Sequence, residues 1–345
     1  MTSERIIHAG LNRRRFLGVT GGLVLLGGGG TLLSGCGGSS SASEEISIVN
    51  SGSVDTLAMQ RILDSRGYFD QFGVKTTTTN VTDGSKATAA VTSGRTDVSM
   101  LNGFSQIFPA INQGASLRLI GGTLAASSLT LWSAQSDVSS LRDLEGRTVG
   151  TGAVGSLLYQ IMIAMFDSVG VDSSKVTFVN VGASSDVLKA VSAKRVDAGL
   201  SSIAFQASAD QFGIHRVVDV YKELPKYTNQ GAFATTKTIS SKRAGLVAVL
   251  AAYNKLFKYL QSPESKDTFL DAYTAVGGDE AGGKVLWNFY QTAKPYDTDI
   301  SLSDEAINYM QQLNVNTSTQ PKLLPVSKVA DMSLATDALA LKPTA

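Results

Sequence analysis

The residues best placed to do chemistry are small hydroxyl and amide side chains that follow short apolar runs. The clearest case lies within Leu141–Met165, where we expect a strand at Thr148–Gly150, a Gly/Ser loop at Thr151–Ser156 and a helix from about Leu157. A loop between a strand and a helix directs free backbone N–H groups at whatever binds above it, and the helix dipole adds partial positive charge. The stretch therefore predicts a loop that cradles an anion.

Similar polar residues follow other expected strands, and Phe104 supplies an apolar wall. Each such residue alone is more often a cap or a turn residue, but several together at strand ends indicate a binding site. Their N–H and O–H donors suit an oxyanion or a neutral polar heterocycle. The predicted ligand-binding residues are Ser51, Thr56, Ser85, Asn102, Phe104, Thr123, Thr151, Gly155, Ser156, Ser184 and Ser202.

The same glycines permit two other interpretations. Gly150, Gly152 and Gly155 satisfy the G-x-G-x-x-G spacing of dinucleotide-binding loops. That site also needs an acidic residue at the end of the next strand, where this sequence has Asn180. The dinucleotide interpretation is therefore disfavoured, whereas glycines that merely permit a tight turn remain an alternative.

Catalytic and metal-binding patterns find little support. The chain contains two histidines, so a Ser–His–Asp triad in the body would have to use His215, and no G-x-S-x-G elbow accompanies it. H-E-x-x-H, C-x-x-C and EF-hand spacings are missing from the sequence. We therefore expect no catalytic residues, no metal site and no cofactor.

Composition and charge indicate a globular body. Apolar residues make up 43% of the chain and charged residues 17%, which is typical of a globular protein. The length of 345 residues is enough for two domains of ordinary size. The formal net charge is +1 and becomes slightly negative without the first 35 residues. Such a balance offers no basic field for nucleic acid.

An internal echo predicts two similar lobes. Residues Ala90–Val98 recur 100 positions later as Ala190–Ala198, with Ala, Val, Arg and Asp in matching places. Each copy reads as the end of a helix, a turn and a buried strand, although chance similarity is an alternative. Ligands of open α/β sheets bind at the carboxyl ends of strands, so two facing lobes would form a cleft there.

The first 35 residues have the layout of an export signal, with a polar start, three arginines and an apolar, Gly-rich run. Arg13–Leu17 resembles the twin-arginine export motif, and Leu33–Cys36 resembles the lipobox of bacterial lipoproteins. Cys36 is the one cysteine of the chain, so lipidation accounts for its presence. Ordinary export and a plain transmembrane anchor are the alternatives, the second disfavoured by the short, glycine-broken apolar run.

The body resembles a known family of transport proteins. Gly67-Tyr68-Phe69, then Gly73-Val74 and a strand, is similar to a signature of solute-binding proteins for sulfonates, taurine, nitrate and thiamine precursors. Ser93–Met100 resembles the turn that leads into a buried strand in that family, and Asp143–Arg147 resembles the family's D-L-x-G-K/R turn. The family usually has Gly-Leu where this sequence has Gly170-Val171. The resemblance covers most of residues 46–240, whereas the rest matches only in being helical.

This resemblance implies an α/β fold of the two-lobed, type II periplasmic-binding-protein kind, each lobe a mixed sheet flanked by helices. The expected division is a signal at residues 1–35, a flexible tether at 36–44, lobe 1 at 45–126 plus 234–345, and lobe 2 at 127–233. Two hinge strands are expected near Thr123–Leu129 and Gln230–Phe233. The helical C-terminal third is expected to serve packing.

The implied function is capture of a small solute outside the cytoplasmic membrane, for delivery to an ABC permease and its cytoplasmic ATPase. The chain is expected to be a monomer, anchored to the outer face of that membrane by lipid on Cys36. Two alternatives remain: a solute-sensing receptor lipoprotein and, less favoured, an enzyme like the relatives that make the thiamine pyrimidine. That enzyme chemistry needs a histidine and a cysteine cluster that this sequence lacks.

Overall fold

The computed structural model describes residues 44–81, 84–228 and 230–344. Ala42–Ala345 form one compact unit. The predicted export signal and Cys36 lie outside the described residues, so these predictions stay as they are. Within the described part, no helix combines the length and the apolar composition needed to cross a membrane.

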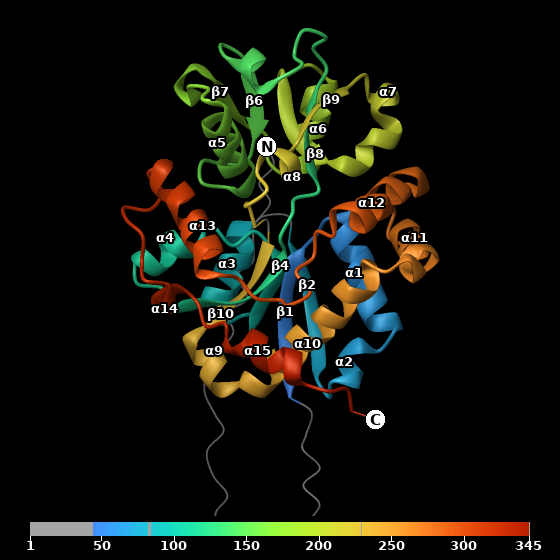
Figure 1. Ribbon diagram of the computed structural model, residues 1–345, viewed down its shortest axis with the longest axis vertical. Helices are drawn as coiled ribbons and strands as arrows, with labels where there is room; N and C mark the ends of the chain where they lie inside the picture. Colours follow the sequence, from blue (N-terminus) through green and yellow to red (C-terminus); the bar gives the residue numbers. More distant parts are fainter. Residues whose placement is uncertain (1–43, 82–83, 229, 345) are drawn as a thin grey trace, which may run out of the picture. The chain divides into compact units, whose positions relative to one another are not determined.

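The first sheet is built mainly from the N-terminal third of the chain (Figure 1). Its order is β2-β1-β3-β10-β4, in which β1 pairs in parallel with β2 and β3, and β10 runs antiparallel to β3 and β4. The strands are β1 (Glu45–Ser51), β2 (Lys75–Val81), β3 (Val98–Asn102), β4 (Leu117–Leu124) and β10 (Gln230–Thr235). The helices between them are α1 (Val54–Ser65), α2 (Tyr68–Gln71), α3 (Gly84–Thr92) and α4 (Ile107–Asn112).

The second sheet is built from the middle of the chain and has the order β7-β6-β8-β5-β9. β6 pairs in parallel with β7 and β8, while β5 runs antiparallel to β8 and β9. Its strands are β5 (Leu129–Ser133), β6 (Thr148–Thr151), β7 (Thr177–Asn180), β8 (Ala198–Ser202) and β9 (His215–Asp219). Its helical segments are η1 (Leu141–Leu144), α5 (Leu157–Val169), η2 (Ser173–Lys175), α6 (Ser184–Ser192), η3 (Ile203–Ser208), α7 (Ala209–Phe212) and α8 (Val220–Glu223).

The remainder of the chain is helical, as the sequence predicts. α10 buries most of its length, and α15 and α1 pack against it. These elements are α9 (Thr236–Ser241), α10 (Arg243–Leu260), η4 (Pro263–Ser265), α11 (Lys266–Ala275), α12 (Glu280–Ala293), α13 (Asp304–Asn316), α14 (Val326–Val329) and α15 (Ser333–Ala340). Not all of them serve packing within one lobe, because α12 contacts η3 and α13 contacts α5.

The internal echo of the sequence corresponds to a repeated structural unit. In the first sheet Asp97 accepts hydrogen bonds from the backbone N–H and the hydroxyl of Ser47, both at 2.8 Å. In the second sheet Asp197 accepts the same pair from Thr148, at 2.8 and 2.7 Å. Each aspartate thus fixes the start of the neighbouring parallel strand, and hydrogen bonding by that strand lowers its pKa in spite of partial burial.

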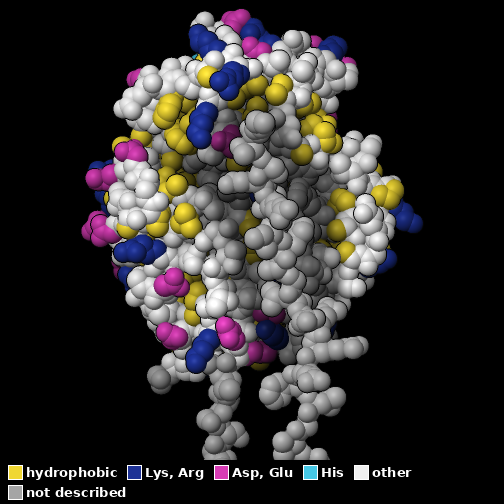
Figure 2. Space-filling model, turned by 180° about the vertical axis from the view of Figure 1, so that it is seen from behind, with side chains coloured by type: hydrophobic (Ala, Val, Ile, Leu, Met, Phe, Trp, Pro, Cys, Tyr) yellow, Lys and Arg dark blue, Asp and Glu magenta, His cyan; other side chains and the backbone are white. Residues whose placement is uncertain are grey.

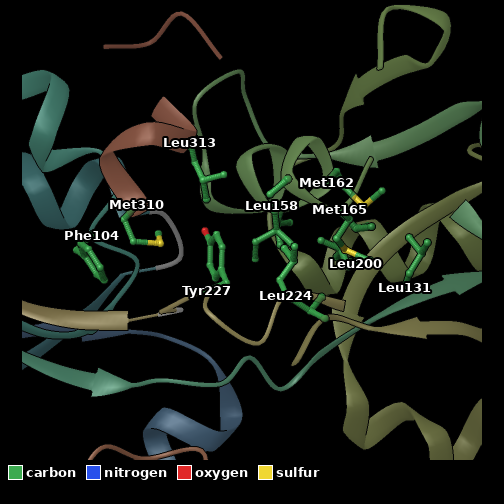
Figure 3. Packing of buried hydrophobic residues seen from close by; sticks show 14 of the residues in the cluster. Phe104, Leu131, Leu158, Met162, Met165, Leu200, Leu224, Tyr227, Met310 and Leu313 are labelled. Carbon is green, nitrogen blue, oxygen red and sulfur yellow. The ribbon is translucent and has the colours of Figure 1, made fainter. Parts of the chain in front are cut away.

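The hydrophobic core falls into two clusters. One lies under α10, α11 and α12, and the other extends from Phe104 and Phe108 through the second sheet. Figure 3 shows Tyr227 between Met310 and Leu313 on one side and Leu158 on the other. Because these residues come from both halves of the structure, apolar packing joins the lobes at this point.

The chain crosses between the sheets twice, after β4 and before β10. The two crossing strands pair with each other, since Gln230 lies opposite Leu124. The lobe boundaries stay a prediction. The structure adds that β10, which belongs to the first sheet, begins at Gln230 and therefore spans the predicted boundary at residues 233/234.

Candidate functional site

The carboxyl ends of the parallel strands in the two sheets meet each other. Gly103, which follows β3, lies so close to the start of α5 that a Cβ atom on it would be 3.2 Å from Leu157 Cδ1. Gln106 Nε2 donates to the carbonyl oxygen of Gly155 at 3.5 Å. The loop after β3 and the Gly/Ser loop after β6 therefore contact each other between the two sheets.

The predicted site residues of the β1–α1 segment form a chain of hydroxyl groups. Ser51 Oγ donates to Ser53 Oγ at 3.3 Å, and Ser53 Oγ donates to Thr56 Oγ1 at 3.0 Å. Thr56 is buried, whereas Ser51 is half-buried. Ser85 is exposed in the first turn of α3. These residues sit at the carboxyl-terminal edge of the first sheet, as the sequence predicts for this segment.

Three other candidates of the first sheet are almost fully buried. Asn102 donates its amide protons to the Val49 carbonyl oxygen at 3.1 Å and to Ser99 Oγ at 2.8 Å, so its nitrogen is committed to the strands. Phe104 is 1% exposed and packs edge-on against Phe108, as part of the core. Thr123 is also 1% exposed, and its hydroxyl has no hydrogen-bond partner.

The candidates of the second sheet lie at its carboxyl-terminal edge. Ser156 caps α5 by accepting from the Tyr159 N–H, and Ser202 caps η3 by accepting from the Ala204 N–H at 3.2 Å. Thr151 Oγ1 donates to the neighbouring Gly152 carbonyl oxygen, and the Ser184 carbonyl oxygen accepts from Ser201. These side chains thus shape the loops, and their role toward a ligand stays a prediction.

Gly155 adopts a backbone conformation that only glycine takes easily. Its φ is +81°, and a Cβ on it would lie 3.5 Å from Thr319 Cγ2. Thr319 follows α13, so the loop also approaches the C-terminal region of the chain. The glycine here is required by backbone geometry, which fits both a binding loop and a tight turn.

Sequence reasoning missed a buried polar network that joins the two halves of the structure. Gln160 of α5 accepts from Tyr227 Oη at 2.9 Å and donates to Asn314 Oδ1 of α13 at 2.6 Å. Asn314 Nδ2 in turn donates to the Ser105 carbonyl oxygen at 2.8 Å. The exposed fractions of Gln160 and Asn314 are 2% and 3%. A glutamine and an asparagine inside separate helices give no sequence signal that they meet.

A second missed feature surrounds Asp55 in the first turn of α1. Asp55 keeps some accessible surface, yet burial raises the pKa of its carboxyl group. Tyr290 and Tyr296 are nearly fully buried nearby; burial raises the pKa of both, and the negative charge of Asp55 contributes.

The one histidine of the described residues takes part in a structural contact. A ring nitrogen of His215, Nε2, lies 2.7 Å from the Val138 carbonyl oxygen. In the described part of the chain, no group of three or more His, Cys, Asp or Glu side chains is arranged to hold a metal ion. Figure 2 shows Lys and Arg interspersed with Asp and Glu over the face turned to the reader, as expected from the near-neutral sequence.

Comparison with solved structures shows the same fold in periplasmic binding proteins. The aliphatic sulphonate binding protein SsuA from Escherichia coli matches with a TM-score of 0.67 and 17% identity, covering 83% of this chain and 92% of that one. The alkanesulfonate-binding protein SsuA from Xanthomonas axonopodis pv. citri, bound to MOPS, matches with a TM-score of 0.67 and 16% identity, covering 85% of this chain and 97% of that one. The nitrate-binding protein NrtA from Synechocystis PCC 6803 matches with a TM-score of 0.71 and 9% identity, covering 86% of this chain and 89% of that one.

At these identities the likeness establishes the fold, which is the two-lobed α/β fold expected from the sequence. A search of curated proteins gives no significant match. The family model described as "NMT1/THI5 like" matches residues 62–265, which is more than half of the chain and includes every strand of the two sheets except β1. The chain therefore belongs to the NMT1/THI5-like family.

Proposed function

We propose that this protein captures a small solute between its two lobes and delivers it to an ABC permease with a cytoplasmic ATPase. The observation that carries the proposal is the meeting of the two carboxyl-terminal sheet edges at Gly103 and Leu157. Ligands of open α/β sheets bind at such edges. Family membership and the fold shared with sulphonate-binding and nitrate-binding proteins support the same role.

The proposed ligand is a small sulfonate-type oxyanion or a solute resembling a thiamine precursor. The Gly/Ser loop Thr151–Ser156 offers backbone N–H groups at the start of α5, a 13-residue helix capped by Ser156. In the proposal, the hydroxyl groups of Thr56 and Ser202, which accept hydrogen bonds from Ser53 and Ala204, supply further donors at the facing edges. Solute binding would favour a closed arrangement of the lobes, which a permease distinguishes from an open one.

The proposal includes anchoring of a monomer to the outer face of the cytoplasmic membrane. It rests on the resemblance of Leu33–Cys36 to a lipobox and of Arg13–Leu17 to a twin-arginine motif. Mass spectrometry of the protein from the membrane fraction tests the anchor. A mature chain that begins at lipidated Cys36 is expected, and an unmodified Cys36 would contradict it.

The ligand class is tested by thermal unfolding of the mature protein with sulfonates, nitrate, aminopyrimidines and aromatic acids. A ligand at one hundred times its dissociation constant adds about 2.7 kcal/mol to the free energy of unfolding. A rise of several degrees in Tm is therefore expected for one class. Unchanged melting with every compound at millimolar concentration would refute the proposed ligand classes.

A further inference from the structure

Helix α13 lies on an arm of the chain that is attached at both ends to the first sheet. Before the helix, the Ile300 carbonyl oxygen accepts from the Gly122 N–H of β4 at 3.0 Å. After it, the Asp331 N–H donates to the Leu119 carbonyl oxygen of the same strand at 2.7 Å. Residues 303–325, here called the α13 arm, therefore belong to the lobe that contains the first sheet, which is called the first lobe below.

Buried side-chain hydrogen bonds make the α13 arm rigid. Gln311 of α13 donates to the Leu324 carbonyl oxygen at 3.0 Å, and its Oε1 accepts from the Leu324 N–H at 2.8 Å and from Gln320 Nε2 at 2.9 Å. The exposed fractions of Gln311 and Gln320 are 0% and 1%. Buried polar networks whose members are satisfied hold their elements in one arrangement. The helix and the chain that returns from it are therefore expected to move together.

Asn314 is the residue through which the α13 arm is hydrogen-bonded to α5 of the second lobe. Its Oδ1 accepts from Gln160 Nε2 of α5 at 2.6 Å, while its Nδ2 donates to the Ser105 carbonyl oxygen of the first lobe at 2.8 Å. Tyr227, on the second crossing between the lobes, donates to Gln160 Oε1 at 2.9 Å and is fully buried. Figure 3 shows Tyr227 beside Met310 of α13. Buried hydrogen bonds thus connect the first lobe, the arm and α5 in series.

The contact between α12 and the second lobe is of a different kind. An added Cβ on Gly282 of α12 would lie 3.2 Å from the Ala204 carbonyl oxygen of η3, and Phe289 packs edge-on against Tyr221 of α8 with a centroid distance of 5.1 Å. Within the described part of the chain, the side-chain hydrogen bonds and ion pairs of α12 stay inside its own lobe. Figure 1 shows α12 and α13 on different sides of the molecule. Opening of the lobes therefore breaks buried hydrogen bonds only on the α13 side.

From these contacts we infer that the α13 arm is a latch, which favours the closed arrangement of the lobes even in the solute-free protein. Opening has to separate Asn314 from Gln160, because both ends of the arm stay with β4. Both amides can bond to water once they separate, so the latch shifts the balance between open and closed forms without preventing opening. A closed form that is already populated also strengthens the apparent affinity for a solute.

The latch goes beyond the proposed function, since it requires nothing about which solute is bound. Pulsed electron double resonance measures it in mature protein from which any solute has been removed by unfolding in urea, dialysis and refolding. Cys36→Ser removes the one cysteine of the sequence, and spin labels are placed at Gln113→Cys, after α4, and Asp167→Cys, in α5, both at exposed positions. One narrow distribution of distances is expected between the two labels.

Asn314→Ala should add a population at longer distance and raise the ratio of open to closed protein about ten-fold or more, because at least one buried hydrogen bond between the lobes is lost. Gln160→Leu removes the partner on the side of the second lobe and should have the same effect. It keeps the test valid if circular dichroism shows that Asn314→Ala does not fold.

Two control variants separate the latch from general effects of substitution. Asn316→Ala removes an exposed asparagine from the same helix, and Lys189→Gly weakens α6 at an exposed position. Both should keep the distribution of the protein with Asn314 and Gln160 intact. Opening in Lys189→Gly equal to that in Asn314→Ala would overturn the inference, because it would trace the opening to a general loss of stability.

Two further results would also overturn the latch. One is a broad or long-distance distribution in the protein that keeps Asn314 and Gln160. The other is a distribution in Asn314→Ala and Gln160→Leu that matches the one in Asn316→Ala. These results would leave the solute-binding function standing, because the thermal unfolding panel tests that function separately.

Discussion

Asn314→Ala tests the buried network that joins α5 and α13. The asparagine side chain accepts from Gln160 Nε2 at 2.6 Å and donates to the Ser105 carbonyl oxygen at 2.8 Å. Alanine removes these two hydrogen bonds and two longer ones, to Gln320 Oε1 at 3.5 Å and from Thr319 Oγ1 at 3.4 Å. The buried Gln160 amide and the Ser105 carbonyl oxygen then lose the partner that Asn314 supplied. Each such group costs about 1–3 kcal/mol, so we expect a loss of about 3 kcal/mol in the free energy of unfolding.

The helix provides a matched control two residues further along. Asn316 is exposed and accepts one hydrogen bond from Gln312 at 2.9 Å. Asn316→Ala therefore removes the same side chain from the same helix without leaving a buried group unsatisfied, and should cost about 0.5 kcal/mol or less. Urea denaturation followed by circular dichroism measures both variants, with the slope of the transition checked for a change in exposed surface.

The network also makes a prediction about coupling. Because Gln160 and Asn314 are hydrogen-bonded to each other, their substitutions should not be additive, and a double-mutant cycle should give a coupling of about 1 kcal/mol or more. A loss of stability in Asn314→Ala no larger than that in Asn316→Ala, or additivity in the cycle, would contradict this coupling. Either result would mean that the hydrogen bond between Gln160 of α5 and Asn314 of α13 does not stabilise the protein.

Three further predictions concern the backbone and the repeated aspartates. Lys194 has φ 54° where its counterpart Gly94 has 72°, so Lys194→Gly should stabilise the protein by about 0.5–1 kcal/mol in thermal unfolding, whereas Lys189→Gly inside α6 should destabilise it by about 1 kcal/mol. The folded-state pKa values of Asp97 and Asp197 are lowered, so the unfolded state binds more protons in acid. The stability that they contribute should be complete above the usual aspartate pKa of about 4 and should be lost as the pH falls through the folded pKa values; a pH titration of urea midpoints that shows no such loss would contradict this. Gly155→Ala should cost about 1 kcal/mol or more, and Gly155→Asn less, because asparagine tolerates positive φ; equal losses in urea denaturation would contradict the role assigned to backbone conformation.

The sequence predicts local structure best where the structure depends on a few neighbouring residues. The Gly/Ser loop ends at Ser156, whose hydroxyl caps α5, and the helix terminates at Gly170 with φ 69°. The spacing of 100 residues between Asp97 and Asp197 corresponds to the same hydrogen bonds in both sheets. These features depend on neighbours in the chain or on a repeated pattern, so they are visible without coordinates.

The parts that escape sequence reasoning depend on contacts between distant segments. Asp55 in a first helical turn reads as an ordinary favourable charge near a helix start, and the burial that raises its pKa appears only when the surroundings are known. Tyr290 and Tyr296 lie in a region expected to serve packing, yet they come to the face of α1 that carries Asp55. Asn102 and Phe104 occur where predicted along the chain, but burial decides which of their atoms a ligand can reach.

The solute-binding function is tested by identifying the molecule that the purified protein carries. Native mass spectrometry of the mature protein, followed by denaturation and analysis of the released fraction, measures whether a small molecule is bound and at what ratio. One solute per chain is expected, which rebinds after refolding and raises Tm. A protein that releases no small molecule, and whose Tm no member of the compound panel changes, would contradict the solute-binding function.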